Sequence, residues 1–232
     1  MFRLERACDK DGNECDILQC GACFALSNSR AHDLLHNSDI KEVQRTDFYI
    51  SSGLTKTQAQ LELDSKSTIL DYLFRKLDLP YHDLTFCDFG GGSGLVAYAA
   101  AKHFRKSYLC EFDMRSAEQV LSVLDRPRNL DIVQSLDEIA EPVDVMFMWH
   151  VLEHIPNPLD FLISAERHFS KNAIFFVQCP GFRPEAIVDC HYTFFNEPSF
   201  RNLFNKIGVK EVEIGFDSSN GFVSYLGMRS SV

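Results

Sequence analysis

The chain has 232 residues, of which 45% are hydrophobic and 24% charged, and its formal net charge is −10. This size and composition fit one sizeable globular α/β domain with a small appendage. The negative charge argues against a nucleic-acid substrate, because phosphate binding needs a basic surface. No apolar run approaches the roughly 18 residues of a membrane span, and the N-terminus lacks the apolar region of a secretory signal. We therefore expect a cytoplasmic protein with neither a membrane nor nucleic acid as partner.

The N-terminal segment, residues 1–55, lacks sustained periodicity and contains half of the eight cysteines, namely Cys8, Cys15, Cys20 and Cys23. In a reducing compartment these side chains are thiols or metal ligands. Of the four scattered cysteines, three lie in or beside apolar runs and are predicted to be small core residues: Cys87, Cys110 and Cys179. Cys190 is the fourth. Residues 56–232 are predicted to form the main domain.

The main domain begins with apolar residues at helical spacing from Thr57 to Leu79, and Pro80 ends this run. Short apolar runs then alternate with amphipathic segments. The predicted strands are Leu84–Phe89, Ser107–Glu111, Leu130–Gln134, Val143–Trp149 and Ala173–Gln178. The predicted helices between them are Gly94–Phe104, Ser116–Leu124 and Pro158–Phe169. This order predicts a doubly wound, mostly parallel sheet with helices on both faces.

The C-terminal tail follows a different pattern. A helix is predicted from about Pro198 to Ile207, with Gly208 as its C-terminal cap. Two apolar runs, Val209–Phe216 and Phe222–Met228, then flank a short turn-rich loop, which is typical of a hairpin. The expected fold is therefore a seven-stranded α/β sheet that ends in an antiparallel hairpin.

The strongest chemical signal is the glycine-rich segment FCDFGGGSGLVAYAAA, in which an apolar strand runs into four glycines and an alanine-rich helix follows. Glycine allows a sharp turn and a close approach of the backbone to a ligand. The N-terminus of the next helix offers free N–H groups and a partial positive charge. Asp88 precedes the first glycine by two positions, where its carboxylate can accept a hydrogen bond from a loop N–H. The segment predicts a ligand-binding loop.

A dinucleotide site is the alternative interpretation of this loop. Its fingerprint needs a third glycine three positions after the second. Counting from Gly90 and Gly92 places Leu95 there, whereas counting from Gly92 and Gly94 places Ala97 there. Alanine is tolerated at that position, so the second register stays open.

An acidic residue ends the next predicted strand. Glu111 stands seventeen residues after Gly94, in the run SYLCEFD. A carboxylate at this place faces the crevice of a doubly wound sheet and can bind both hydroxyls of a ribose. Asp113 competes for the same role, because it lies on the same side if the strand continues.

These residues resemble the class I S-adenosylmethionine-dependent methyltransferases, small-molecule group. Asp88, Gly90, Gly92 and Gly94 match the family motif D-x-G-x-G-x-G, and Glu111 matches the acidic residue that holds the ribose. The segment VDVMFMWHVLEHIPNP resembles the family's fourth strand and the run after it, and the matching positions are Asp144, Leu152, Glu153, His154, Ile155, Asn157 and Pro158. The resemblance covers roughly residues 57–230 and also accounts for the terminal hairpin.

The resemblance implies S-adenosylmethionine as cofactor. The implied cofactor-binding residues are Asp88, Gly90, Gly91, Gly92, Gly94, Glu111, Asp113, Ser135, Leu136 and Trp149. Two positions depart from the family pattern. Gly91 replaces a commoner Cys or other small residue. The acidic residue that contacts adenine falls near Ser135, so that adenine would be held there by backbone groups.

The pair Cys20 and Cys23, followed by FALSNSR, resembles the second knuckle of a zinc-binding segment that precedes some of these domains. A tetrahedral thiolate site normally uses two C-x₂₋₄-C pairs. Here Cys8 and Cys15 have six residues between them, which departs from that pattern. A zinc site on the four cysteines and a knuckle that has lost its metal both stay open, and His32 or His36 could replace a ligand.

Three histidines are candidate catalytic bases: His150, His154 and His191. The first two follow the predicted fourth strand and the third follows the fifth, so all can face the methyl group. Imidazole can take a proton near neutral pH. A structural role is an equal alternative for His154, because it belongs to a shared motif. Aromatic residues could wall an acceptor site or pack in the core: Trp149, Tyr192, Phe194 and Phe195.

The sequence therefore predicts a methyltransferase that acts on a small-molecule acceptor, such as a sugar or another metabolite. The first alternative is a non-catalytic module of the same fold, against which the intact glycine loop and Glu111 argue. The second is a nicotinamide oxidoreductase, which the glycine spacing and the terminal hairpin disfavour.

Overall fold

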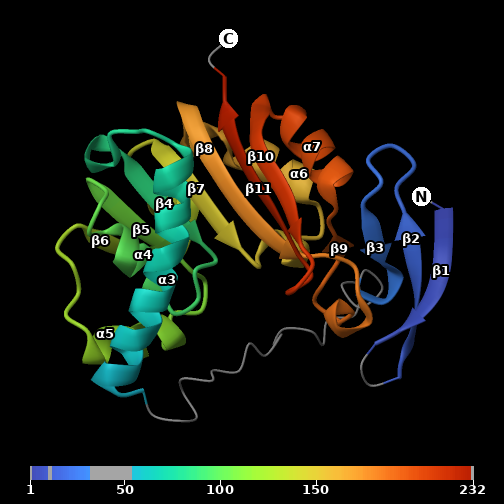
Figure 1. Cartoon of the computed structure of the whole chain (residues 1–232), viewed down its shortest axis with the longest axis horizontal. Helices are drawn as coiled ribbons and strands as arrows, with labels where there is room; N and C mark the ends of the chain where they lie inside the picture. The colour runs from blue at the N-terminus through green and yellow to red at the C-terminus, as the bar shows by residue number, and fades with distance from the viewer. Residues whose placement is uncertain (1, 10–11, 32–53, 231–232) are drawn as a thin grey trace. The chain divides into compact units, whose positions relative to one another are not determined.

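The structure is a computed structural model that describes residues 2–9, 12–31 and 54–230 (Figure 1). His32 and His36, the substitute zinc ligands considered above, lie outside these ranges. The chain forms two compact units. Unit 1 comprises Met1–Val43, Met148–Glu166 and Ile174–Val232, and unit 2 comprises Gln44–Phe147 and Arg167–Ala173.

The main sheet has seven strands in the order β10-β11-β8-β7-β4-β5-β6. The strands are β4 Thr85–Phe89, β5 Lys106–Cys110, β6 Leu130–Val133, β7 Val143–Trp149, β8 Phe169–Pro180, β10 Val209–Asp217 and β11 Phe222–Arg229. Strand β4 runs parallel to β5 and β7, and β5 runs parallel to β6. Strand β11 is antiparallel to both β8 and β10. The predicted α/β sheet with its terminal hairpin is confirmed.

Unit 2 contains helices α3 Lys56–Lys76, α4 Leu95–Ala100 and α5 Arg115–Val123, with the short 3₁₀ turns η1 Tyr81–Asp83 and η2 Leu136–Glu138. Thr55 and Gln58 form a capping box that starts α3. Helix α4 is shorter than predicted, because Asn129 Nδ2 donates to the carbonyls of Ala101 and Phe104 and so satisfies the chain where the helix ends.

The core of unit 2 has two parts. Small side chains let α4 lie close to the sheet, in a cluster of Ala97, Ala101, Leu109, Ala117 and Leu130. Aromatic rings fill a second part, where the Phe86 ring lies 4.9 Å from that of Phe104 and 5.8 Å from that of Phe147. The high phenylalanine content of the chain is thus used in core packing.

Unit 1 contains helices α6 Pro158–Ala165 and α7 Glu197–Asn205, and the 3₁₀ turns η3 Leu152–His154 and η5 Pro184–Ala186. A further turn, η4 Glu166–His168, begins in unit 1 and ends in unit 2. Asn196 caps α7 by accepting from the Ser199 N–H at 2.9 Å. The rings of Phe195 and Phe200 stack at 4.6 Å, and those of Phe204 and Tyr225 stack at 4.3 Å. The second stack holds α7 against β11.

A second sheet of unit 1 has the order β1-β2-β3-β9 and is antiparallel throughout. Its strands are β1 Phe2–Cys8, β2 Glu14–Gln19, β3 Leu26–Asn28 and β9 Thr193–Phe194. Ile17, Leu26 and Phe194 lie in its core. Apolar periodicity does not reveal these strands, because β1 and β2 carry charged residues such as Arg3 and Asp16, which pair at 3.0 Å on the exposed surface. The N-terminal segment thus shares a sheet with a strand of the main domain.

Among the described residues, no helix combines the length and the apolar character needed to cross a bilayer.

Candidate functional site

The glycine loop of unit 2 follows β4 and leads into α4. Gly90, Gly92 and Gly94 have φ angles of +66°, +56° and +75°, which L side chains rarely adopt. A Cβ built on Gly94 would lie 2.7 Å from Leu109 Cδ2, and one on Gly91 would lie 2.6 Å from Leu109 Cδ1. A Cβ on Gly92 would meet nothing within 4 Å. The loop therefore packs tightly on one side and presents open space at Gly92.

Asp88 is buried beneath this loop with 2% of its surface exposed. One of its carboxylate oxygens accepts from the Ala97 N–H in the first turn of α4, at 3.2 Å. Burial, together with the nearby Glu111 carboxylate, raises the pKa of Asp88 to about 7, although the Ala97 hydrogen bond opposes the shift. In this structure Asp88 fixes the glycine loop to the helix.

Glu111 and Asp113 differ in what they bind. Glu111 follows β5 directly, and its two carboxylate oxygens accept from the N–H groups of Gly92 at 2.8 Å and Asp113 at 3.0 Å. The carboxylate of Asp113 is held by the side chain of Arg115, which lowers the pKa of Asp113 to about 2. Of the two acids, Glu111 is the one that adjoins the glycine loop.

Two further features lie just after β5 and just after β6. Phe112, which the sequence analysis did not single out, has 86% of its surface exposed, although phenylalanine is usually buried. Its signal in the sequence is an aromatic residue directly after the strand-end acid.

After β6, the Glu138 carboxylate accepts from the N–H groups of Gln134 and Ser135, both at 3.0 Å. Leu136, the neighbour of Ser135, is buried.

In unit 1, β7 ends at Trp149, and His150 follows with a φ of +56°. Such a conformation is uncommon for a non-glycine residue, and strained residues cluster at functional sites. The Trp149 Nε1–H donates to Gln178 Oε1 at 2.6 Å, and the His150 N–H donates to the Gln178 carbonyl at 2.8 Å. The His150 ring packs edge-on against Phe222 at 4.5 Å. These contacts fix both side chains.

Glu153 is a fully buried acid between two histidines. Its Oε1 lies 3.4 Å from His150 Nδ1 and 3.8 Å from His154 Nε2. By strict geometry, neither carboxylate oxygen has a hydrogen-bond partner within the described residues. Burial raises the pKa of Glu153, but the two nearby imidazoles and the residue's own backbone N–H together outweigh this effect, and the pKa lies below its ordinary value. The site thus holds a buried negative charge.

His154 and His191, the other predicted bases, lie together with Cys190. The two imidazole rings are 4.7 Å apart, and one ligand atom from each of the three residues lies within 4.8 Å of the others. The Nδ1 of His154 lies 3.0 Å from the Cys190 carbonyl, and the Nδ1 of His191 lies 2.7 Å from the Ala186 carbonyl. In the part of the chain that the structure describes, this is the group that could hold a metal ion.

The four N-terminal cysteines are free thiols that lie in different environments. Cys20 and Cys23 adjoin each other in one turn, where hydrogen bonds from the Cys23 and Ala22 backbone and the Cys23 side chain lower the pKa of Cys20. Cys8 is exposed on β1, and Cys15 is buried on β2. They do not belong to any described group with metal-ligand spacing, so the described residues give the predicted N-terminal zinc site no support.

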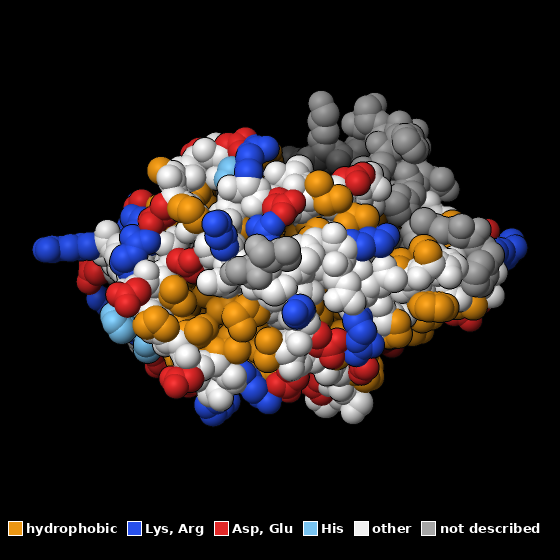
Figure 2. All heavy atoms as spheres, turned by 90° about the horizontal axis from the view of Figure 1, so that it is seen from above, with side chains coloured by type: hydrophobic (Ala, Val, Ile, Leu, Met, Phe, Trp, Pro, Cys, Tyr) orange, Lys and Arg blue, Asp and Glu red, His pale blue; other side chains and the backbone are white. Residues whose placement is uncertain are grey.

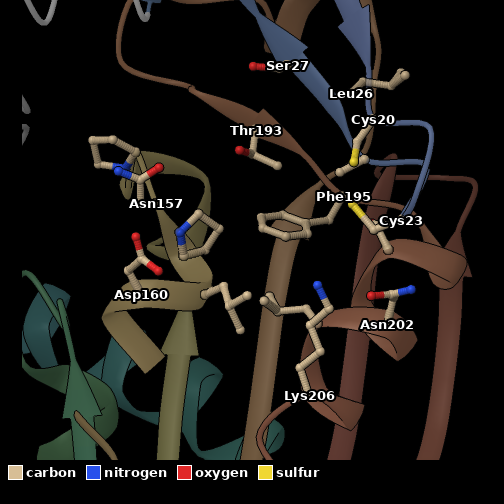
Figure 3. A pocket seen from close by; sticks show the side chains of 16 residues that line it. Cys20, Cys23, Leu26, Ser27, Asn157, Asp160, Thr193, Phe195, Asn202 and Lys206 are labelled. Atoms are coloured by element: carbon tan, nitrogen blue, oxygen red, sulfur yellow. The ribbon is translucent and has the colours of Figure 1, made fainter. Parts of the chain in front are cut away.

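Unit 1 also contains a cavity of about 350 Å³. Its lining comes from Cys20–Ser27, from the residues before and at the start of α6, and from β9 and α7. The wall is mainly apolar, with Leu159, Phe195 and Leu203 among its residues, and it carries the charged side chains of Asp160 and Lys206. Figure 3 shows Phe195 and Lys206 directed into the same space. Phe195, predicted as either wall or core, thus lines this cavity, whereas Phe194 is buried in the N-terminal sheet.

Residues 58–214 match the family described as methyltransferase domain. The chain belongs to the methyltransferase domain family. The expectation of an S-adenosylmethionine-dependent methyltransferase of class I fold is thereby confirmed, and the match spans the glycine loop, Glu111 and all three candidate histidines. No curated protein has a significantly similar sequence.

Solved methyltransferase structures share the fold. Magnesium protoporphyrin IX methyltransferase (ChlM) from Synechocystis PCC 6803 with bound SAH has a TM-score of 0.57 at 14% identity, over 73% of this chain and 84% of that one. The 1,6-didemethyltoxoflavin-N1-methyltransferase from Burkholderia thailandensis has a TM-score of 0.55 at 12% identity, over 72% of this chain and 78% of that one. The pyocyanin biosynthetic protein PhzM matches with a TM-score of 0.54 at 14% identity over 66% of this chain, which spans only 52% of PhzM. At these identities the likeness shows the fold alone.

Proposed function

We propose that the methyltransferase domain acts on a small-molecule acceptor held in the cavity of unit 1. The observation that carries this proposal is the size and lining of the cavity. Its volume of about 350 Å³ lies within the range of small-molecule pockets, about 300–1,000 Å³. A mainly apolar wall with a few convergent polar groups is also typical of such pockets.

The polar groups of the lining favour an acceptor that carries hydroxyls, such as a sugar. Asp160 can accept hydrogen bonds and Lys206 can donate them, while the hydroxyls of Ser27 and Thr193 can do both. The ring of Phe195 offers an apolar face to a ring-shaped ligand. We infer an acceptor with an apolar ring face and a hydroxylated edge.

Unit 2 supplies a cradle that fits S-adenosylmethionine. The open space at Gly92 would let the backbone approach the cofactor. We assign the ribose hydroxyls to Glu111, whose carboxylate adjoins the loop at the Gly92 N–H. The exposed ring of Phe112 is available to stack on adenine. Asp113, already held by Arg115, is assigned no direct contact. When bound, the cofactor supplies a methyl group on a sulfonium that a nucleophile can displace.

We assign the role of proton acceptor to His150 when the acceptor group must lose a proton. Its strained backbone and its ring contact with Phe222 hold it in one orientation, and Glu153 Oε1 lies 3.4 Å from its Nδ1. A carboxylate beside Nδ1 favours a proton there, so that Nε2 can accept the proton from the substrate. His154 and His191 are assigned a different role below.

Charge and cysteine chemistry agree with a metabolite as acceptor. Figure 2 shows Lys and Arg side chains scattered among acidic and apolar ones, with no continuous basic patch among the described residues of that face. The net charge of −10 also argues against a nucleic-acid acceptor. All eight cysteines are free thiols, which supports the expected cytoplasmic location.

The test is transfer of an isotope-labelled methyl group from S-adenosylmethionine to fractionated cell extract. We expect label in the small-molecule fraction, and transfer lowered by Lys206→Met and Asp160→Asn with unchanged affinity for S-adenosylhomocysteine. Lys210→Met, an exposed lysine on β10, is the matched control. His150→Asn tolerates the positive φ and should slow turnover by about 10²–10⁴-fold. Label only in protein or nucleic acid would refute the proposed acceptor class, and full activity of both cavity variants would refute the cavity.

A further inference from the structure

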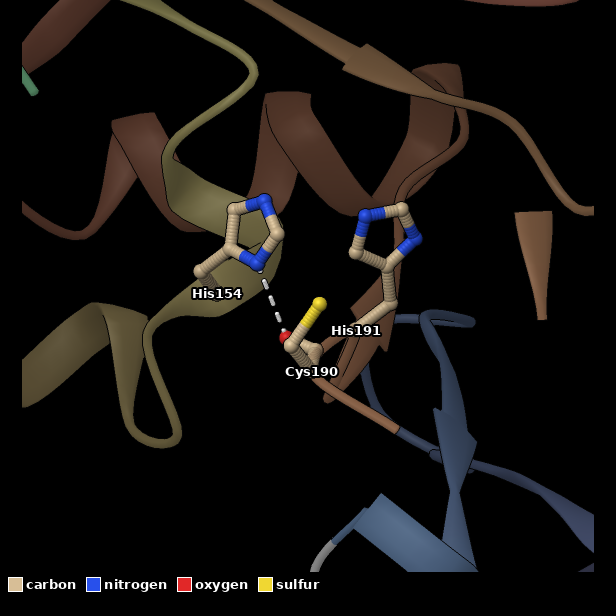
Figure 4. Close-up of side chains that lie close together, drawn as sticks. All are labelled: His154, Cys190 and His191. Atoms are coloured by element: carbon tan, nitrogen blue, oxygen red, sulfur yellow. Dashed lines mark hydrogen bonds between the residues drawn. The ribbon is translucent and has the colours of Figure 1, made fainter. Parts of the chain in front are cut away.

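We propose that His154, Cys190 and His191 form a zinc-binding site. The site belongs to unit 1 and is independent of the acceptor proposal. Figure 4 shows the Cys190 sulfur between the two imidazole rings. The ligand atoms lie within 4.8 Å of one another, whereas ligands at zinc bond lengths of about 2.0–2.3 Å stand about 3.3–3.8 Å apart in a tetrahedron. A closure of about 1 Å would thus bring them to bonding distance.

Hydrogen bonds orient both imidazoles for metal binding. A carbonyl oxygen can only accept, so each Nδ1 that faces one, in His154 at 3.0 Å and in His191 at 2.7 Å, carries the ring proton. In a neutral imidazole the lone pair is then on Nε2. Metal-binding histidines almost always donate their other ring N–H to a carbonyl, carboxylate or water in this way. Both rings therefore leave Nε2 free to bind a metal ion.

The buried carboxylate of Glu153 is the second, independent observation. Its side chain has 0% exposure, and its Oε1 lies 3.8 Å from the Nε2 of His154. Burying a carboxylate is costly unless positive charge lies nearby, and within the described residues neither of its oxygens has a hydrogen-bond partner. The thiolate of Cys190 and this carboxylate together carry two negative charges, which balance the charge of Zn²⁺.

Backbone contacts hold the two segments of the site together. The Tyr192 N–H donates to the Glu153 carbonyl at 2.8 Å, which joins the Cys190 loop to η3. Asn28 Nδ2 donates to the Val188 carbonyl at 3.2 Å, and Arg30 pairs with Asp189 at 3.1 Å. Strand β3 and the residues after it therefore brace the loop. A zinc ion would link this braced loop to the end of β7 through His154.

The experiment measures zinc in the purified full chain and its replacement by Co²⁺. We expect about one equivalent of zinc per chain and, with Co²⁺, a thiolate-to-cobalt charge-transfer band. Because loss of an outer hydrogen-bond partner alone costs about 10–100-fold in metal affinity, His191→Ala should lose at least about 100-fold. Cys190→Ser should abolish the charge-transfer band and weaken zinc binding. Cys190→His should restore the zinc affinity but not the band. Circular dichroism of each metal-free variant checks that the fold is intact.

The double variant Cys20→Ser, Cys23→Ser is the matched control, because it removes the competing thiol pair of the same unit. This variant should still bind about one equivalent of zinc and should still show the charge-transfer band with Co²⁺. Wild-type zinc affinity in folded Cys190→Ser would overturn the proposal, as would zinc lost only from the control variant. A wild type that takes up neither Zn²⁺ nor Co²⁺ would overturn it as well.

Discussion

At the scale of single residues, the proposed cofactor cradle has two candidate acids, which the sequence places two positions apart. The two acids differ in their hydrogen-bond partners. Glu111 accepts from the N–H groups of Gly92 and Asp113, whereas the Asp113 carboxylate is bound to Arg115. A carboxylate that already faces the loop can turn from its N–H groups to ribose hydroxyls. One that is held by a guanidinium must first break an ion pair.

Glu111→Gln keeps the shape of the side chain but removes its charge. Charge-assisted hydrogen bonds contribute roughly 1.5–3 kcal/mol, so affinity for S-adenosylhomocysteine should fall by about 10- to 100-fold. Asp113→Asn should change it much less. Titration calorimetry on both variants measures the difference. A larger loss in Asp113→Asn would move the ribose contact to that residue.

Phe112→Ala removes an exposed ring that has no packing role. Stacking of a base on an aromatic side chain is worth about 1–3 kcal/mol, so affinity for S-adenosylhomocysteine should fall by about 5- to 150-fold with an unchanged melting temperature of the free protein. Phe216→Ala, which removes another exposed phenylalanine, is the control and should leave affinity unaltered. Equal affinities in the two variants, measured by calorimetry, would exclude adenine stacking on Phe112.

At the scale of elements, the turn from β4 to α4 combines three left-handed glycines with a buried acid. Gly92 differs from Gly91 and Gly94, because its Cβ position is open rather than blocked by Leu109. The positive φ of Gly92 would be energetically costly for a residue with a side chain, but the space that its Cβ would occupy is empty in the folded protein. Gly208, which lies beyond the C-terminal cap of α7, has the same combination of a positive φ, +72°, and open space.

Gly92→Val and Gly208→Val should therefore carry a similar backbone cost, of the order of 1–2 kcal/mol or somewhat more for a branched side chain. Only Gly92→Val should abolish binding of S-adenosylhomocysteine, since its side chain would fill the ligand's path. Urea unfolding measures the first effect and calorimetry the second. If Gly92→Val bound normally, the loop would not approach the cofactor at that residue.

At the scale of the whole molecule, Asp88 makes the stability of the fold depend on pH. Its pKa rises from an ordinary value of 3.8 to about 7 on burial. Between these values the folded chain holds a proton that the unfolded chain releases. Protonated Asp88 therefore contributes to the stability of the folded state. This contribution is complete below about pH 3.8 and is lost as the pH rises through about 7.

Asp88→Asn should remove this dependence, because its side-chain oxygen can still accept from Ala97 but does not titrate. The free energy of unfolding of the wild type, from urea titrations, should fall relative to that of Asp88→Asn between about pH 4 and pH 7. Asp83→Asn, at an exposed acid, serves as the control and should follow the wild type. Parallel curves for wild type and Asp88→Asn would show that the buried carboxyl stays ionised.

The sequence by itself determined the features that depend on local chemistry. Strand-to-helix alternation, the glycine loop and the terminal hairpin follow from periodicity and from the backbone freedom of glycine, and all lie close to their predicted positions. The acid after β5 could be located, but Glu111 and Asp113 could not be distinguished from the pattern, because their difference depends on which one Arg115 binds.

Only the tertiary structure decided which distant residues meet. Ser27 donates to the carbonyl of Tyr192 across 165 positions of chain, and this contact joins the N-terminal strands to the main domain. The same long-range packing brings His154 beside Cys190 and His191, and it places Cys20 and Lys206 around one cavity. Local residue patterns carry no record of such contacts, since they arise only when separate elements bury their apolar faces together.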